Sequence, residues 1–147
     1  MIQQEWIDYK INVRERLKKF ALNILILSEM FPDTTRSKVI NYQLTKSGTS
    51  AYANYRAALR GRSASEFFSK LSISVEEIDE SEMWLELTII SKIIDNELIL
   101  DLHNESIELV KILSNMRKNH QSHQSNQSHQ SHQSHQSSQS HQSHQSK

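Results

Sequence analysis

The sequence contains no cysteine, one proline and two glycines in 147 residues. Without cysteine there is neither a disulfide framework nor a thiolate metal site. So few turn-forming residues argue against a β protein, which needs a turn about every 8–12 positions. No basic N-terminal segment precedes an uninterrupted apolar run, so no signal peptide is evident. The most apolar stretch, residues 21–27, is far too short to cross a bilayer. We therefore expect a soluble cytoplasmic protein with no membrane partner.

An excess of charge of either sign is also absent, but the zero net charge conceals a separation of signs. Residues 36–70 carry seven Lys or Arg and one acid, Glu66. Residues 71–108 carry eleven Asp or Glu and one Lys, Lys92. A cationic surface on a small protein favours a polyanion or an acidic protein as its partner.

Apolar residues are missing altogether from residues 120–147, a His-Gln-Ser repeat with substitutions at Asn126 and Ser138. Such a segment cannot offset its own ordering entropy, so we predict a disordered tail. Residues 1–119 then form one domain of ordinary size. Seven histidines in the tail would bind Ni, Cu or Zn weakly. The alternative, which we favour, is a tolerated repeat expansion without a role.

Periodicity predicts four long helices. Residues 3–30 present an apolar face and stop before Pro32. Thr34 or Thr35 can cap the second helix, which runs to Arg60 and stops at Gly61. Ser63 and Glu66 form the capping box of a third helix that runs to about Ile94. The fourth helix covers residues 97–117. Short connections between long helices favour an all-α, antiparallel up-down-up-down four-helix bundle.

The second helix has two different faces. Its inner face carries small residues around Gly48, which costs about 1 kcal/mol in a helix relative to Ala and so indicates close packing. The segment Ser47–Ser50 resembles a phosphate loop only superficially, because the preceding strand and the Lys-Ser/Thr ending are missing. The outer face and the loop after it supply candidate nucleic-acid contacts: Lys38, Lys46, Arg56, Arg60 and Arg62. A solvated helix face, or ion pairs with the acidic third helix of the same or a neighbouring chain, is the alternative.

The third helix has a second apolar strip outside its core stripe. Burial of this strip against another subunit predicts a homo-oligomer, with Ile73, Trp84 and Leu87 at the centre of the contact and Glu80 and Glu86 at its rim. The alternative is an indole that lies flat over a neighbouring Lys or Arg of its own chain.

Several short motifs of residues 47–87 occur together in one order. They are Ser-Gly-Thr-Ser at 47–50, Asn-Tyr-Arg at 54–56, Arg-Gly-Arg-Ser at 60–63, Glu-Phe at 66–67, Lys-Leu at 70–71 and Trp-Leu-Glu-Leu at 84–87. In this combination the chain resembles, over residues 10–115, the four-helix-bundle proteins encoded in 23S ribosomal RNA intervening sequences. Ala57 departs from the family pattern, in which an acid often follows Asn-Tyr-Arg.

The resemblance implies a four-helix bundle that assembles into a cyclic homopentamer without enzymatic activity. The chain is also distantly similar to the accessory variability proteins of diversity-generating retroelements. Those proteins bind a reverse transcriptase and nucleic acid through a basic surface. By this analogy RNA or DNA, and a reverse transcriptase, are the candidate partners.

No motif predicts catalysis. Arg117 and His123 have the spacing used by ribonuclease toxins built on small helical bundles, but His123 belongs to the repeat. No cofactor and no metal site are predicted. We therefore predict a non-enzymatic, homo-oligomeric protein that associates with RNA or DNA through its second helix. A protein-interaction scaffold that binds no nucleic acid is the alternative.

Overall fold

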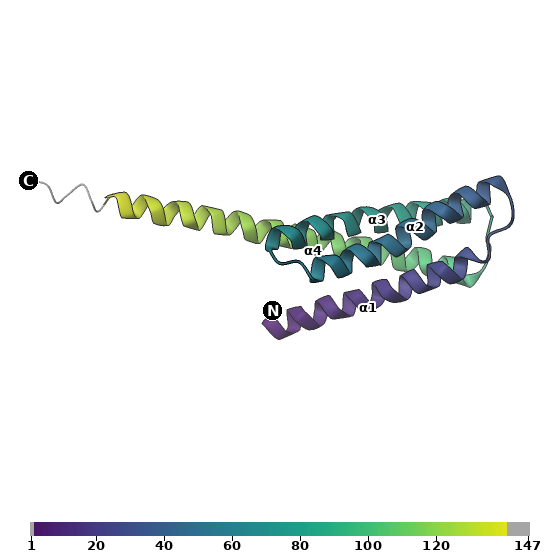
Figure 1. Ribbon diagram of the computed structural model, residues 1–147, viewed down its shortest axis with the longest axis horizontal. Coiled ribbons are helices and arrows are strands. Elements are labelled where there is room, and N and C mark those ends of the chain that lie inside the picture. The colour runs from purple at the N-terminus through teal and green to yellow at the C-terminus, as the bar shows by residue number, and fades with distance from the viewer. Residues whose placement is uncertain (1, 141–147) are drawn as a thin grey trace, which may run out of the picture. The chain divides into compact units, whose positions relative to one another are not determined.

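The computed structural model describes residues 2–140 and contains four α-helices: α1 (Gln3–Ser28), α2 (Thr35–Leu59), α3 (Ala64–Ile90) and α4 (Glu97–Ser140) (Figure 1). No strand occurs among these described residues. The chain divides into two compact units after Ser114. In the first unit consecutive helices run antiparallel, so the predicted all-α, up-down-up-down four-helix bundle is confirmed.

Side-chain caps set the starts of α2 and α3. The hydroxyl of Thr34 accepts a hydrogen bond from the backbone N–H of Ser37 at 3.3 Å. Ser63 accepts one from the N–H of Glu66 at 3.1 Å, and the Glu66 carboxylate accepts one from the N–H of Arg62 at 2.7 Å. These contacts satisfy backbone donors that have no partner within the helix. The predicted start of α3 is therefore confirmed, and of the two threonines predicted to cap α2 it is Thr34 that does so.

The third helix ends earlier than predicted, at Ile90 rather than near Ile94. Lys92 adopts a left-handed backbone conformation with φ of 55°, and the N–H of Ile93 donates to the carbonyl of Thr88 at 3.2 Å. A hydrophobic pattern alone gives no sign of this local break, because Lys92 replaces the glycine usually found at such a position.

The helix α2 packs against both α1 and α3. On the side of α1, a Cβ added to Gly48 would lie 3.0 Å from Cγ1 of Ile24. On the side of α3, the hydroxyl of Ser81 donates to that of Ser47 at 2.8 Å. Both Gly48 and Ser47 are buried, which confirms that the small residues of α2 serve close helix packing.

Polar contacts attach the first turns of α4 to α1 and α3. The guanidinium of Arg16 donates two hydrogen bonds of 2.8 Å to the Glu105 carboxylate, and a ring nitrogen of His103 lies 3.0 Å from Oε1 of Glu82. The hydrogen bond to Glu105 raises the pKa of Arg16, against the opposing effect of burial. Such a bidentate pair fixes helix orientation as well as adding energy.

The fourth helix continues to Ser140, past the end predicted near residue 117, so residues 120–140 are helical where we predicted disorder. Extending an existing helix avoids the cost of nucleation, and glutamine is a good helix former. The hydroxyls of Ser122 and Ser125 donate to backbone carbonyls four residues earlier, at 3.1 Å in each case. The part of the predicted tail from 141 to 147 lies outside the described residues.

Candidate nucleic-acid interface

The five cations predicted to contact nucleic acid are all exposed. At 3.6 residues per turn, four of them project within an arc of roughly 80° on α2. These four are Lys38, Lys46, Arg56 and Arg60, which together with Tyr42 and Tyr52 we call the basic face of α2. Arg62 follows the helix, in the connection to α3, where its backbone N–H bonds Glu66. The structure thus groups four of the five predicted residues on one surface.

Few carboxylates lie close to these cations. Lys38 pairs with Asp33 at 2.8 Å, where both side chains are exposed. Burial and then the charge of Glu80 raise the pKa of the Glu77 carboxyl, and the nearby charge of Lys46 opposes this rise. Among the described side chains, Arg56, Arg60 and Arg62 form no ion pair. The acids of α3 therefore do not pair with these three arginines within one chain.

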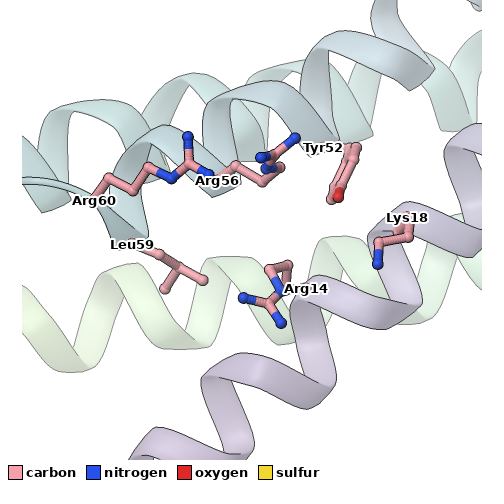
Figure 2. A pocket seen from close by; sticks show the side chains of 6 residues that line it. All are labelled: Arg14, Lys18, Tyr52, Arg56, Leu59 and Arg60. Carbon is pink, nitrogen blue, oxygen red and sulfur yellow. The ribbon is translucent and has the colours of Figure 1, made fainter.

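A cationic cleft of about 450 Å³ lies between α1 and α2. Figure 2 shows its walls, with two side chains from α1 facing four from α2. The α1 wall consists of Arg14 and Lys18, and the α2 wall of Tyr52, Arg56, Leu59 and Arg60. Four of these six side chains are cationic, so the cleft concentrates positive potential at the border of the two helices.

The two α1 cations of this cleft share one carboxylate, that of Glu15. Glu15 accepts a hydrogen bond from Lys18 at 3.0 Å and another from Arg14 at 3.2 Å. The Lys18 ammonium and then the Arg14 guanidinium hold the pKa of the Glu15 carboxyl below its usual value, while burial opposes them. Glu15 pairs with two of the four cations that line the cleft, so the cleft keeps an excess of positive charge.

The guanidinium of Arg56 lies over the ring of Tyr52, with Cζ 5.6 Å from the ring centroid. Such a cation–π contact restrains a long side chain without neutralising it. Arg56 is therefore held at the cleft with its charge still available to an anion.

Sequence reasoning missed Arg14, Lys18 and Tyr52 as site residues. Arg14 and Lys18 are one helical turn apart, so they share a side of α1. The sequence contained one indication of this part of the site, namely two cations at i and i+4 beside the apolar face of α1. Its meaning depends on which helix lies next to that side, and the sequence of α1 alone does not specify the neighbour.

The predicted subunit contact forms a separate surface on α3. Ile73, Glu80 and Trp84 are half-buried, and Leu87 is 41% exposed. The indole N–H of Trp84 donates to the Glu80 carboxylate at 3.1 Å. At about 100° per residue these four side chains share one side of the helix, and we call them the α3 strip.

Glu86 does not belong to the α3 strip. It is exposed, and its position two residues after Trp84 turns it roughly 160° away around the helix. Glu86, predicted with Glu80 at the rim of the subunit contact, therefore lies on another side of α3. A single contact surface on α3 would therefore include Glu80 at its rim but exclude Glu86.

The indole of Trp84 has no Lys or Arg over its ring within the described part of the chain; the cation–π contacts there involve Trp6, Tyr52 and Phe67. The alternative explanation for its exposure, a flat indole under a cation of its own chain, is thus not observed.

Neither a metal site nor a membrane-spanning helix is found among the described residues. No group of three or more His, Cys, Asp or Glu side chains is placed to hold a metal ion there. Within the same part of the chain, none of the helices combines the length and apolar character needed to span a bilayer.

Comparison with known proteins agrees with the fold and the sequence motifs. The sequence model of the family described as 23S rRNA-intervening sequence protein matches residues 9–115. A crystal structure from Bacteroides thetaiotaomicron, described as a protein with unknown function from the S23 ribosomal protein family, is 33% identical. The similarity covers 74% of this chain and 97% of that protein, with a TM-score of 0.67. None of the curated proteins matches this chain.

Proposed function

The chain belongs to the 23S rRNA-intervening sequence protein family, and on this premise we propose that it is a non-enzymatic protein that binds RNA or DNA through the basic face of α2. The observation that carries the proposal is the α1–α2 cleft, which four cations line and in which Arg56 and Arg60 have no carboxylate partner among the described residues. Neutralisation of phosphates by Lys and Arg is the main sequence-independent contribution to nucleic-acid affinity. A cytoplasmic location accompanies the proposal and is tested by fractionation of the native cell.

The arrangement of the cations supports a long anion rather than a small one. The basic face extends from Lys38 to Arg60, which at 1.5 Å per residue is about 33 Å of helix. The cleft lies toward one end of this length and is lined by Arg56 and Arg60. An extended chain of phosphates can contact all of these groups at once, whereas a single phosphate can contact only the few around the cleft.

Assembly of several chains would multiply these contacts. We propose that the α3 strip is the contact between subunits in a ring of five. Trp84 and Leu87 are apolar side chains that remain partly exposed in the single chain, as expected for residues that a second subunit covers. A ring repeats the basic face, and each additional contact with one polyanion becomes intramolecular after the first.

Salt titration of nucleic-acid binding tests the proposed function. With a labelled 20-nucleotide strand and its duplex as separate probes, the logarithm of the affinity should fall linearly with the logarithm of the salt concentration. The double variant Arg56→Ala/Arg60→Ala should weaken binding about tenfold or more and reduce the slope by about one to two. Lys111→Ala is the matched control, because it removes a cation on α4 that lies 3.8 Å from Glu108.

The exposed apolar side chains of the α3 strip also support a second candidate, a protein-interaction scaffold without nucleic-acid binding. An accessory subunit of a reverse transcriptase would be one such protein. Absence of binding to both probes at low salt would exclude the nucleic-acid proposal and favour the scaffold. Co-purification from the native cell, followed by sequencing of bound nucleic acid and identification of bound proteins, then distinguishes the partners.

A further inference from the structure

Two tyrosines occur among the cations of the basic face. Tyr42 is 66% exposed, although its ring is a large apolar surface. It lies one helical turn after Lys38 and one turn before Lys46, so a cation flanks it on each side along the helix. Tyr42 also lines a shallow groove of about 500 Å³ with Lys38 and Lys46.

Tyr52 repeats this arrangement at the other end of the face. It is half-buried at the α1–α2 cleft and lies one turn before Arg56, whose guanidinium covers its ring. The two tyrosines are ten residues apart, which is about 15 Å along the helix axis. Aromatic and cationic side chains therefore alternate along one face, with the more exposed ring at Tyr42.

From this alternation we propose that the basic face is a binding site for single-stranded nucleic acid. Phosphates contact Arg14, Lys18, Arg56 and Arg60 at the cleft, and an unpaired base stacks on Tyr42. This inference rests on the proposed function and adds the strandedness of the ligand to it. Stacking platforms interleaved with cations are the means by which proteins hold single strands without reading their sequence.

The exposed ring distinguishes a single strand from a duplex. In a duplex the bases are paired and stacked on one another, so a side chain on a flat helix face reaches only phosphates and sugars. Lysine and arginine alone would serve that purpose, and the ring of Tyr42 would add nothing. In a single strand the faces of the bases are accessible, and the same ring adds binding energy at each stacked base.

Binding of an unstructured 20-nucleotide strand and of its duplex, at equal salt and with full-length protein, tests the inference. We expect the single strand to bind at least about tenfold more tightly. Tyr42→Ala should weaken single-strand binding about five- to hundredfold and leave duplex binding unchanged, whereas Tyr42→Phe should retain wild-type affinity. Deoxyribose and ribose versions of the strand show whether the site discriminates between DNA and RNA.

Matched variants separate a local effect from a general one. Tyr9→Ala removes another exposed tyrosine, on α1, which does not line the cleft; it should leave both affinities unchanged. If the duplex binds as tightly as the single strand and Tyr42→Ala has no effect, the inference is wrong but the proposed function stands. If neither probe binds at low salt, the proposed function itself fails. Each variant is checked by circular dichroism. We expect the bundle to be intact in Tyr42→Ala, because the side chain of Tyr42 is exposed and not part of the core.

Discussion

Gly48 of α2 lies directly against Ile24 of α1. A Cβ at Gly48 would come within 3.0 Å of Cγ1 and 3.2 Å of Cγ2 of that side chain. Ile24 is 1% exposed and its branched side chain is stiff at χ1. The separation of these two helices, and with it the width of the adjoining cleft, therefore depends on a residue without a side chain.

Replacing Gly48 by Ala should destabilise the bundle. The substitution gains about 1 kcal/mol of helix propensity, but overpacking at a rigid contact costs about 1–3 kcal/mol. We expect a net loss of up to about 2 kcal/mol in the free energy of unfolding, measured by urea titration. Ile24→Ala removes the opposing atoms, so the double variant should be more stable than the sum of the two single effects predicts. If the effects of the two substitutions on the free energy of unfolding were strictly additive, the contact between Gly48 and Ile24 would not be the cause of the lost stability.

Tyr55→Phe tests a buried hydrogen bond between α2 and α1. Tyr55 is fully buried, and its hydroxyl donates to the backbone carbonyl of Lys10 at 2.8 Å. Loss of this hydrogen bond should cost about 1 kcal/mol at neutral pH. The effect is measured by thermal or urea unfolding, and Tyr9→Phe, at an exposed position, is the control.

The pH dependence of the same variant has a definite sign. Burial raises the pKa of Tyr55 above its ordinary value, with Tyr9 adding to the effect and Arg14 opposing it. The unfolded chain therefore loses this proton first, near pH 10, and the stabilisation present below that pH declines as pH rises further. Tyr55→Phe should reduce the alkaline loss of stability. If the unmodified protein and Tyr55→Phe lost the same stability at alkaline pH, the assignment of this loss to the Tyr55 hydroxyl would be wrong.

Trp84→Ala tests the proposed subunit contact. If the indole is a central anchor, its truncation should cost at least about 2 kcal/mol of association free energy, and the particle mass in light scattering should fall. Met83→Ala is the control, because Met83 is also exposed but projects roughly 100° away around α3. A monomeric mass for the unmodified protein would exclude the contact altogether.

A chain that ends at Asn119 tests whether the repeat contributes to the stability of the bundle. The side chains of residues 121–131 are all exposed, so their removal should leave the midpoint of thermal unfolding unchanged. The loss of helical signal on truncation, measured by circular dichroism, reports how much of this segment is helical in solution. A lowered midpoint would show that the repeat stabilises the bundle.

The sequence predicted the helices and their inner faces well, because a 3.6-residue apolar period is a local property. It predicted poorly what depends on two helices at once. Ser74 and Ser81 of α3 do not fit an apolar stripe, yet both are buried and donate to α2, at 2.7 Å to the Ala51 carbonyl and at 2.8 Å to the Ser47 hydroxyl. A serine is compatible with a core only when the neighbouring helix supplies an acceptor.

The candidate site was likewise predicted from one helix and is made of two. The cations of α2 could be found because they recur on a single face. Arg14 and Lys18 join them only because α1 packs beside α2. Glu86, predicted at the rim of the subunit contact, lies on another side of α3 than Trp84. The extension of α4 into the repeat could not be predicted from a hydrophobic pattern, since that segment has none.

The separation of charge along the chain has a consequence for how the protein behaves in bulk. The helix α2 carries four Lys or Arg and no acid, whereas most of the acids lie on α3 and the start of α4, and the sequence pI is about 7.1. Near neutrality such molecules have no net repulsion but strong oppositely charged patches, so they attract one another head to tail in dilute buffer. Added electrolyte screens that attraction, and the protein should consequently dissolve better, and be retained less by both anion- and cation-exchange media, as the ionic strength increases.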